Sequence, residues 1–240
     1  MEINLKNMRK NRERMLELEA IESDFITYWK NKVTFIENKM LHIQLDELEK
    51  SVAPLTLLNH ILKPYQFSTA QIEQIYLSKN KQAGGIFYSS TTRLLRNRDQ
   101  LILQNNEDSS NVASLMIDSI EEFKIRWGNT QIDILQAEDY PSAPIDFKSQ
   151  IVLKGSDLIF PLQLRYRQEG DFFYPIGMEG KKKVSKLMKD LKIDQFTKEK
   201  IPILVNGNGD IIWILGLASD RRYQNSSQST DLLHLKYVKI

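Results

Sequence analysis

The N-terminal third of the chain carries apolar residues at helical spacing. Between residues 5 and 36 they recur at steps of three and four, and neither glycine nor proline occurs before Pro54. This pattern predicts that the chain opens with one long amphipathic helix. A second helical region is predicted over residues 45–62, with an interruption near Pro54, because proline is tolerated in the first turn of a helix.

A third helix is predicted after Pro64. Ser68 is followed three residues later by Gln71, a pair that fits a capping box, and the helical pattern continues to Leu77. Packing of the predicted helices would bury one set of apolar side chains: Leu57, Leu58, Ile61, Phe67, Ile72, Ile75 and Tyr76. The sequence therefore predicts a helical N-terminal lobe.

After Gly84 and Gly85 the apolar period changes from helical to extended. Short strands are predicted over residues 86–90, 92–95, 101–103, 123–127 and 130–135. Residues 97–99 would form a turn, and a loop would contain Pro141 and Pro144. The polar stretch 105–111 predicts the boundary between two lobes.

The second half of the chain predicts a small mixed domain. Residues 184–191 place their apolar side chains on one helical face, between strands predicted at 158–166 and 231–240. Two runs rich in β-branched residues, 201–205 and 211–217, flank Asn206-Gly207-Asn208-Gly209-Asp210 and predict a β-hairpin.

The predicted fold class is α+β, with an N-terminal helical lobe followed by a small mixed α/β C-terminal domain that holds a β-hairpin and a basic helix. Three segments are predicted: a helical domain over residues 1–104 that ends in short strands, a β-rich connecting segment over 105–157, and a C-terminal domain over 158–240. The length of 240 residues and the 41% hydrophobic content suit two lobes, each with its own core.

Composition excludes several kinds of site and favours one cellular location. The absence of cysteine excludes disulfides and thiolate metal sites and favours an intracellular protein. No signal-peptide pattern opens the chain, and no apolar stretch approaches the ~18 residues of a membrane span, so a cytoplasmic location is predicted. The three histidines are isolated in sequence, so none predicts a metal site.

Positive charge concentrates in one stretch. Residues 165–200 hold ten Lys or Arg against six Asp or Glu, whereas the whole chain carries a net charge of only +2. The glycines of this stretch flank an aromatic patch, Phe172-Phe173-Tyr174, and a triple lysine directly follows Gly180. Backbone N–H groups and ammonium groups here could converge on a phosphate, although a lysine run alone is more often a solvated turn.

The acidic residues of this region do not predict catalysis. Asp171, Asp190, Asp210 and Asp220 would be a weak metal cluster, because Asp210 belongs to a tight turn and Asp171 more readily accepts a turn N–H or an arginine. Ser185 has no histidine near it in sequence, so no nucleophile and base pair is indicated. We predict no catalytic, cofactor-binding or metal-binding residue.

A series of motifs resembles the C-terminal domain of bacterial tRNA(Ile)-lysidine synthetase. The motifs are Gly170-Asp171-Phe172, Pro175-Ile176-Gly177-Met178, Lys182-Lys183-Val184-Ser185, Ile201-Pro202-Ile203-Leu204, Trp213, Gly216 and Asp220-Arg221-Arg222-Tyr223. Tyr88-Ser89-Ser90 and the segment from Leu94 to Leu103 resemble the end of that family's middle, substrate-binding domain. The resemblance thus spans most of the chain.

The resemblance implies an activity. Members of the family use ATP and magnesium to join lysine to C2 of the wobble cytidine of tRNA(Ile). An N-terminal domain with a Ser-Gly-Gly-x-Asp-Ser phosphate-binding loop performs the adenylation, and no such loop occurs here. The chain is therefore expected to be the inactive, tRNA-recognising portion of the ligase, with that N-terminal domain and tRNA(Ile) as partners and homodimerisation as a possibility.

The resemblance also implies a tRNA-binding face that contacts the acceptor stem. Its expected residues are Arg165, Arg167, Lys181, Lys182, Lys183, Lys186, Lys189, Arg221 and Arg222. Two positions depart from the family pattern. Lys186-Leu187-Met188 replaces the Asp-Phe-Phe of many members, and Ala218 stands where an arginine is often found.

Two other interpretations remain open at this point. The chain could be a non-catalytic RNA-binding or adaptor protein with the same fold, or its first helix could bind a protein partner within a scaffold. Arg93, Arg96 and Arg98 lie close in sequence and would either meet RNA phosphates or only solubilise a strand edge.

Overall fold

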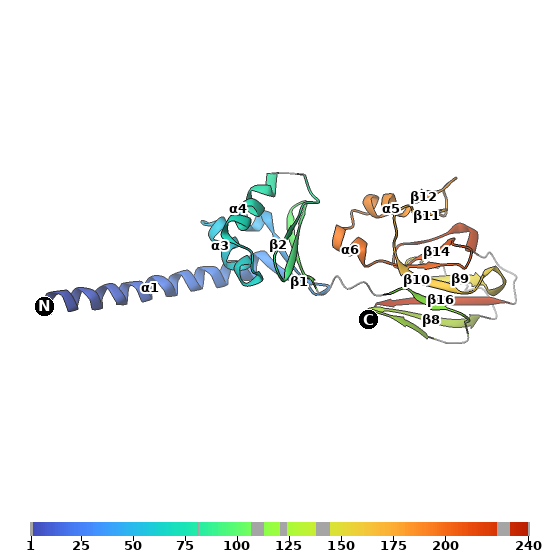
Figure 1. The fold of residues 1–240 in the computed structure, drawn as a ribbon, viewed down its shortest axis with the longest axis horizontal. Coiled ribbons are helices and arrows are strands. Elements are labelled where there is room, and N and C mark those ends of the chain that lie inside the picture. The colour runs from blue at the N-terminus through green and yellow to red at the C-terminus, as the bar shows by residue number, and fades with distance from the viewer. Residues whose placement is uncertain are drawn as a thin grey trace. The chain divides into compact units, whose positions relative to one another are not determined.

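The computed structural model describes residues 2–80, 82–106, 113–120, 124–137, 145–224 and 231–239. The chain divides into two compact units, Met1–Ser110 and Asn111–Ile240. Both units combine helices with antiparallel sheets (Figure 1), so the predicted α+β class is confirmed.

The first unit packs helices on a five-stranded sheet. Its helices are α1 Glu2–Val33, α2 Leu45–Glu49, α3 Pro54–Leu62, α4 Thr69–Leu77 and the short 3₁₀ segments η1 Lys63–Tyr65 and η2 Ser78–Asn80. Its strands are β1 Thr34–Glu37, β2 Met40–Gln44, β3 Ile86–Tyr88, β4 Thr92–Asn97 and β5 Gln100–Asn105, in the order β1-β2-β5-β4-β3. The predicted break before Pro54 is confirmed, since α2 and α3 are separate helices.

The hairpin of β1 and β2 was not predicted. The sequence placed Ile36 at the end of the first helix, but α1 ends at Val33 and Ile36 lies in β1 opposite Leu41. Asn38 and Lys39 form the turn in left-handed conformations, with φ of 50° and 62°. Because asparagine enters this region more readily than most residues, the chain reverses here without a glycine.

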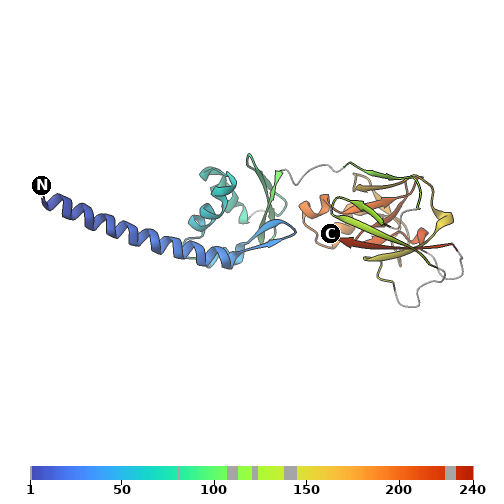
Figure 2. The same cartoon turned by 90° about the horizontal axis from the view of Figure 1, so that it is seen from below.

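One buried cluster joins the helices and the sheet of this unit. Its side chains come from α3 and α4 and from strands β2, β4 and β5: Ile43, Leu57, Leu58, Ile61, Leu62, Ile72, Ile75, Leu94, Leu101 and Leu103. Val33 at the end of α1 is also fully buried in it. Figure 2 shows the same helices beside the sheet from a second direction.

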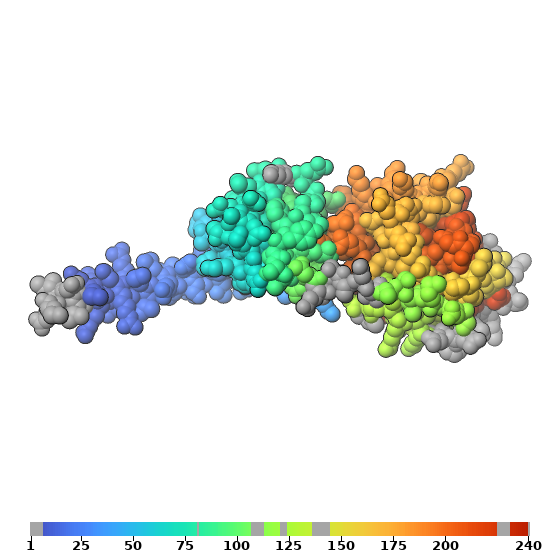
Figure 3. Space-filling model, in the orientation of Figure 1, coloured from blue at the N-terminus to red at the C-terminus, as the bar shows by residue number. Residues whose placement is uncertain are grey.

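From residue 7 onward, helix α1 meets this core only near its C-terminal end. Ile26 and Trp29 pack against the cluster, whereas every residue from 7 to 24 is exposed. Figure 3 shows the exposed surface of this helix in blue. None of the helices in the described residues is long and apolar enough to cross a membrane.

The capping box at the start of α4 is confirmed. The Ser68 hydroxyl accepts from the backbone N–H of Gln71 at 3.3 Å, and the Gln71 side chain accepts from the N–H of Ser68 at 2.9 Å. Gln71 also donates to the carbonyl of Tyr88 at 2.9 Å, which ties the helix start to β3. The cap therefore fixes both the helix and its position beside the sheet.

We expect Ser68→Ala to lower the free energy of unfolding of the first unit by about 1 kcal/mol, because the N–H of Gln71 loses its acceptor. Urea unfolding monitored by far-ultraviolet circular dichroism measures this free energy, because most helical residues belong to the first unit. Ser68→Asp is the matched control, because its carboxylate caps the same N–H. Equal stability of Ser68→Ala and the wild type would contradict the prediction.

The described residues of the second unit form three sheets. The first has the order β15-β14-β13-β10-β6, the second β7-β8-β16-β9, and a two-stranded ribbon pairs β11 with β12. Their bounds are β6 Leu115–Ile117, β7 Lys124–Trp127, β8 Thr130–Ala137, β9 Gln150–Lys154, β10 Leu162–Tyr166, β11 Phe172–Phe173, β12 Lys182–Lys183, β13 Pro202–Val205, β14 Ile211–Ile214, β15 Ala218–Ser219 and β16 Leu232–Lys239. The helical segments are α5 Val184–Asp190, α6 Gln195–Glu199, η4 Gly155–Asp157 and η5 Arg221–Tyr223.

Several local predictions for this unit are confirmed. The hairpin of β13 and β14, the helix α5 and the last strand β16 lie where the sequence placed them. The strand expected over residues 158–166 begins only at Leu162, after η4 and a cis Phe160–Pro161 peptide bond. The predicted loop with Pro141 and Pro144, and most of the predicted boundary at 105–111, lie outside the described residues.

The residues predicted as a connecting segment, 105–157, contribute strands to these sheets. β6 pairs with β10, and β9 pairs with β16, although β16 follows it by more than seventy residues. Pairings of this range are not visible in local sequence patterns. The division between this segment and residues 158–240 as separate domains stays a prediction.

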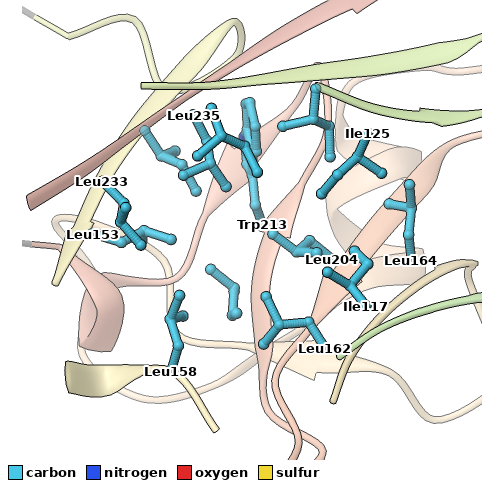
Figure 4. Close-up of a cluster of buried hydrophobic side chains, with 14 of the residues drawn as sticks. Ile117, Ile125, Leu153, Leu158, Leu162, Leu164, Leu204, Trp213, Leu233 and Leu235 are labelled. Atoms are coloured by element: carbon cyan, nitrogen blue, oxygen red, sulfur yellow. The ribbon is translucent and has the colours of Figure 1, made fainter. Parts of the chain in front are cut away.

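Two buried clusters form on opposite faces of the first sheet. Trp213 is fully buried between the two larger sheets, where it meets Leu204 of the neighbouring strand and Leu235 of β16 (Figure 4). Its indole N–H donates to the carbonyl of Phe147 at 2.8 Å. Ile203 and Val205 point to the other face, because side chains alternate along a strand, and there they meet α5.

Candidate nucleic-acid interface

The β11–β12 ribbon separates an inner from an outer face. Phe173 is fully buried opposite Lys182, and one residue earlier Phe172 lies opposite Lys183. Both Phe172 and Lys183 are exposed. Directly opposed residues of an antiparallel pair project to the same side, so the inner pair anchors the ribbon and the outer pair faces solvent.

Helix α5 continues this arrangement. Val184 and Met188 are fully buried against the sheet, whereas Lys183, Lys186 and Lys189 are exposed at steps of three residues. Among the described residues none of these three lysines has an ion-pair partner within 4.0 Å. Because one face of α5 is buried against the sheet, the ammonium groups of these three lysines form a row on its exposed face.

Lys182 has a structural partner instead. Its ammonium lies 2.8 Å from a carboxylate oxygen of Asp190, across the length of α5. The hydrogen bond from Lys182 lowers the pKa of Asp190 below its ordinary value of 3.8, and the positive charges of Lys186 and Lys189 lower it further. The Asp190 carboxylate thus holds the Lys182 ammonium along the helix.

Arg165 forms a buried ion pair with Asp171. Its guanidinium donates two hydrogen bonds to Asp171, at 2.8 and 2.9 Å, and both side chains are only 10% exposed. Asp171 also accepts from the N–H of Gln168 at 2.7 Å, so it takes both an arginine and a turn N–H, as predicted. The pair closes the turn between β10 and β11.

Asp220 organises the segment that follows β11. It is fully buried and accepts from the N–H groups of Tyr174 and Arg222 at 2.9 Å each, and also from the Arg222 guanidinium. Arg222 reaches Asp210 at 2.9 Å as well. The hydrogen bond to Asp220, and then the one to Asp210, raise the pKa of Arg222 above its ordinary value.

Arg221 lies next to the loop but remains exposed. Its backbone N–H donates to the carbonyl of Tyr174, and its guanidinium donates to the carbonyl of Met178, both at 2.8 Å. The guanidinium carbons of Arg221 and Arg222 lie 5.8 and 4.4 Å from the centre of the Tyr174 ring. These are cation–π distances.

The structure sorts the predicted site residues into two groups. Lys181, Lys183, Lys186, Lys189 and Arg221 are exposed on or beside the β11–β12 ribbon and α5. Arg165, Lys182 and Arg222 are engaged with carboxylates, and Arg167 is half-buried. We call the first group the lysine face.

Arg93 and Arg96 of strand β4 are both engaged in hydrogen bonds within the first unit. Arg96 is buried and donates to the carbonyls of Lys79, at 2.7 Å, and Arg98. Arg93 is three residues away on the same strand, so it projects to the opposite face, where it donates to Gln104 at 2.8 Å. Arg96 therefore acts within the structure, and Arg93 and Arg96 do not share one side of the strand.

The four aspartates considered as a metal cluster are engaged with three different basic side chains. Asp171 binds Arg165, Asp190 binds Lys182, and Arg222 joins Asp210 to Asp220. Within the described residues, no group of three or more acidic or histidine side chains could hold a metal ion.

Comparison with known proteins covers both units. Residues 36–106 match a family model described as "TilS substrate binding domain", and residues 162–236 match one described as "TilS substrate C-terminal domain". Together these matches cover more than half of the chain. The chain belongs to the tRNA(Ile)-lysidine synthase family. The lysine face lies within the second match.

Curated relatives of this family are longer than the chain. The tRNA(Ile)-lysidine synthase of Parabacteroides distasonis is 30% identical over 197 residues, which cover 82% of this chain and 44% of the relative. That of Porphyromonas gingivalis is 30% identical over 195 residues, covering 75% and 41%. The chain therefore spans less than half the length of these relatives. A crystal structure of the TILS C-terminal domain is 21% identical, with a TM-score of 0.48, and the match covers 53% of this chain and 98% of that one.

No role at this face was predicted for two aromatic residues, Phe172 and Tyr174. Their rings are in contact with each other, and the Lys181 ammonium lies over the Phe172 ring. The alternation of Phe172, Phe173 and Tyr174 was the available signal, because it predicts one buried ring between two outward ones.

Proposed function

We propose that this chain is the tRNA-recognition portion of a tRNA(Ile)-lysidine synthase, an ATP-dependent ligase that joins lysine to C2 of the wobble cytidine of tRNA(Ile). The observation that carries the proposal is the lysine face within a domain of this family. Catalysis is assigned to an N-terminal phosphate-binding-loop domain that uses ATP and magnesium, and the chain alone is expected to be inactive. The proposal places the protein in the cytoplasm and leaves homodimerisation possible.

The proposed contact is electrostatic. Exposed ammonium groups at Lys181, Lys183, Lys186 and Lys189 neutralise backbone phosphates and release their counterions, whatever the base sequence. An RNA duplex presents phosphates and 2′-hydroxyls along a wide, shallow groove, which suits a rigid convex element such as α5. Arg165 and Arg222 support this face by fixing the loops beside it, and we assign them that positioning role.

We expect the 240-residue chain to bind a tRNA(Ile) with a CAU anticodon more tightly than an unrelated tRNA, with affinity that falls as salt rises. The logarithmic slope is expected to be about 0.7 to 0.9 per phosphate contact, so that several contacts give a slope of about three or more. Fluorescence anisotropy across a salt series measures both quantities.

The outcomes of this titration separate the functional candidates. Preference for tRNA(Ile) supports the synthase portion, whereas equal, salt-dependent binding of both tRNAs supports a non-catalytic RNA-binding protein. Absence of binding to either tRNA contradicts the proposed role of the lysine face. A Ser-Gly-Gly-x-Asp-Ser loop, encoded upstream in frame or in an adjacent gene, would independently support the ligase.

A further inference from the structure

The outer face of the β11–β12 ribbon exposes an aromatic ring among cations. Phe172 is 39% exposed, although its neighbour Phe173 is fully buried. The ammonium of Lys181 lies 4.7 Å from the centre of the Phe172 ring, and Lys183 is its directly opposed neighbour on β12. Phe172 therefore keeps part of a large apolar ring exposed to solvent beside two exposed lysines.

The ring is held in place by rigid neighbours. Tyr174 contacts Phe172 edge-on, with ring centres 6.2 Å apart and planes at 78°. The backbone of Tyr174 is fixed on both sides, because its N–H donates to buried Asp220 and its carbonyl accepts from Arg221. Phe172 is therefore positioned in advance on a two-stranded ribbon anchored by Phe173 and Lys182.

We propose that Phe172 is a stacking site for an unpaired RNA base, which rests on the proposal that this face binds tRNA. Every nucleobase offers a π-face that stacks on an aromatic side chain, and the adjoining phosphate needs a cation within reach. Lys181, whose ammonium contacts the ring, and Lys183, the directly opposed residue of β12, supply that cation. The lysine row of α5 continues from Lys183 and supplies contacts for the phosphates of an adjacent duplex.

The charge of the surroundings favours RNA over a protein partner. Lys181, Lys183 and Arg221 are exposed at or beside the ribbon, against Glu179 as the exposed carboxylate of the loop before Lys181, and the carboxylates of Asp171 and Asp220 are occupied by arginines. A protein interface centre is usually depleted in lysine, whereas aromatic rings interleaved with basic residues suit single-stranded nucleic acid. The site thus recognises an unstacked base beside a duplex. Phosphate contacts alone cannot distinguish such an RNA from a fully paired one.

The test compares two RNAs that differ only in an unpaired segment. A short blunt RNA duplex and the same duplex with a single-stranded 3′ extension are titrated against the full chain by fluorescence anisotropy at fixed salt. The wild type is expected to bind the extended duplex about fivefold or more tightly than the blunt one. Phe172→Leu is expected to lose this preference while its affinity for the blunt duplex stays the same.

Two further variants serve as controls. One keeps an aromatic ring at position 172, and the other removes a similarly exposed phenylalanine elsewhere in the unit. Phe172→Trp keeps a π-face and is expected to retain the preference, whereas leucine keeps only the apolar bulk. Phe160→Leu removes another phenylalanine of the same unit, which is 38% exposed, and should leave the preference unchanged. Circular dichroism of each variant verifies that the unit is folded.

The results also distinguish the stacking site from the tRNA-binding proposal. If the wild type binds both duplexes equally and Phe172→Leu changes neither affinity, the stacking site is overturned while the lysine face stands. If Phe172→Leu weakens both duplexes to the same degree, the ring has a structural role and the stacking site is again overturned. If the wild type binds no RNA, both proposals fail, and the exposed ring is better explained as a surface for a protein.

Discussion

Reversing the charge of Lys183 and Lys186 together is expected to weaken tRNA binding by about tenfold or more near physiological salt. Both ammonium groups are exposed on one side of α5, and neither has an ion-pair partner among the described residues. Lys183→Glu/Lys186→Glu removes two cations and adds two anions opposite RNA phosphates. The logarithmic salt slope should also fall by about one for each lost contact.

A matched variant separates a local contact from net charge. Lys148→Glu/Lys236→Glu changes the charge of the chain by the same amount, at two exposed lysines outside the ribbon and α5. This control is expected to leave the salt slope unchanged and to lower affinity only slightly, because screening weakens distant charges beyond about 10 Å. If both double variants lose the same affinity, the lysine face is not a defined binding surface. Non-specific attraction between the chain and RNA would then explain the binding.

The sequence showed that the basic stretch carries many positive charges. It could not show which of these side chains are exposed and which are paired with carboxylates. Counting Lys and Arg over residues 165–200 correctly indicated a positive region. The count could not show that Arg165 is buried against Asp171 or that Arg222 is shared between Asp210 and Asp220. Asp220 and Tyr174 are 46 residues apart, and only the fold brings their groups together.

Elements with local signals were predicted well. The hairpin around residues 206–210 and the capping box of Ser68 each depend on residues a few positions apart. The β1–β2 hairpin was missed because Val33 and Ile36 continue the helical spacing, and because its turn uses Asn38 and Lys39 instead of glycine. Long-range pairings such as β9 with β16 depend on packing across the whole unit, which no local pattern encodes.

Replacing Asp220 with alanine is expected to lower the free energy of unfolding of the second unit by about 3 kcal/mol. The carboxylate is fully buried, and its loss leaves the N–H groups of Tyr174 and Arg222 without their acceptor. The guanidinium of Arg222 also loses one of its two carboxylates. Urea unfolding followed by tryptophan fluorescence measures the change, because Trp127 and Trp213 are both buried in this unit.

Asp210→Asn is the matched control, since Asp210 binds the same guanidinium from a half-exposed position. An exposed ion pair contributes little, so this variant is expected to lose no more than about 1 kcal/mol. The two carboxylates thus differ in burial and in the backbone N–H groups that only Asp220 satisfies. Equal losses in the two variants would mean that the ion pair with Arg222, and not the buried backbone hydrogen bonds, fixes the loop. In that case the positions of Tyr174 and of the ring beside it would depend on Arg222, and Arg222→Gln would reproduce the whole effect.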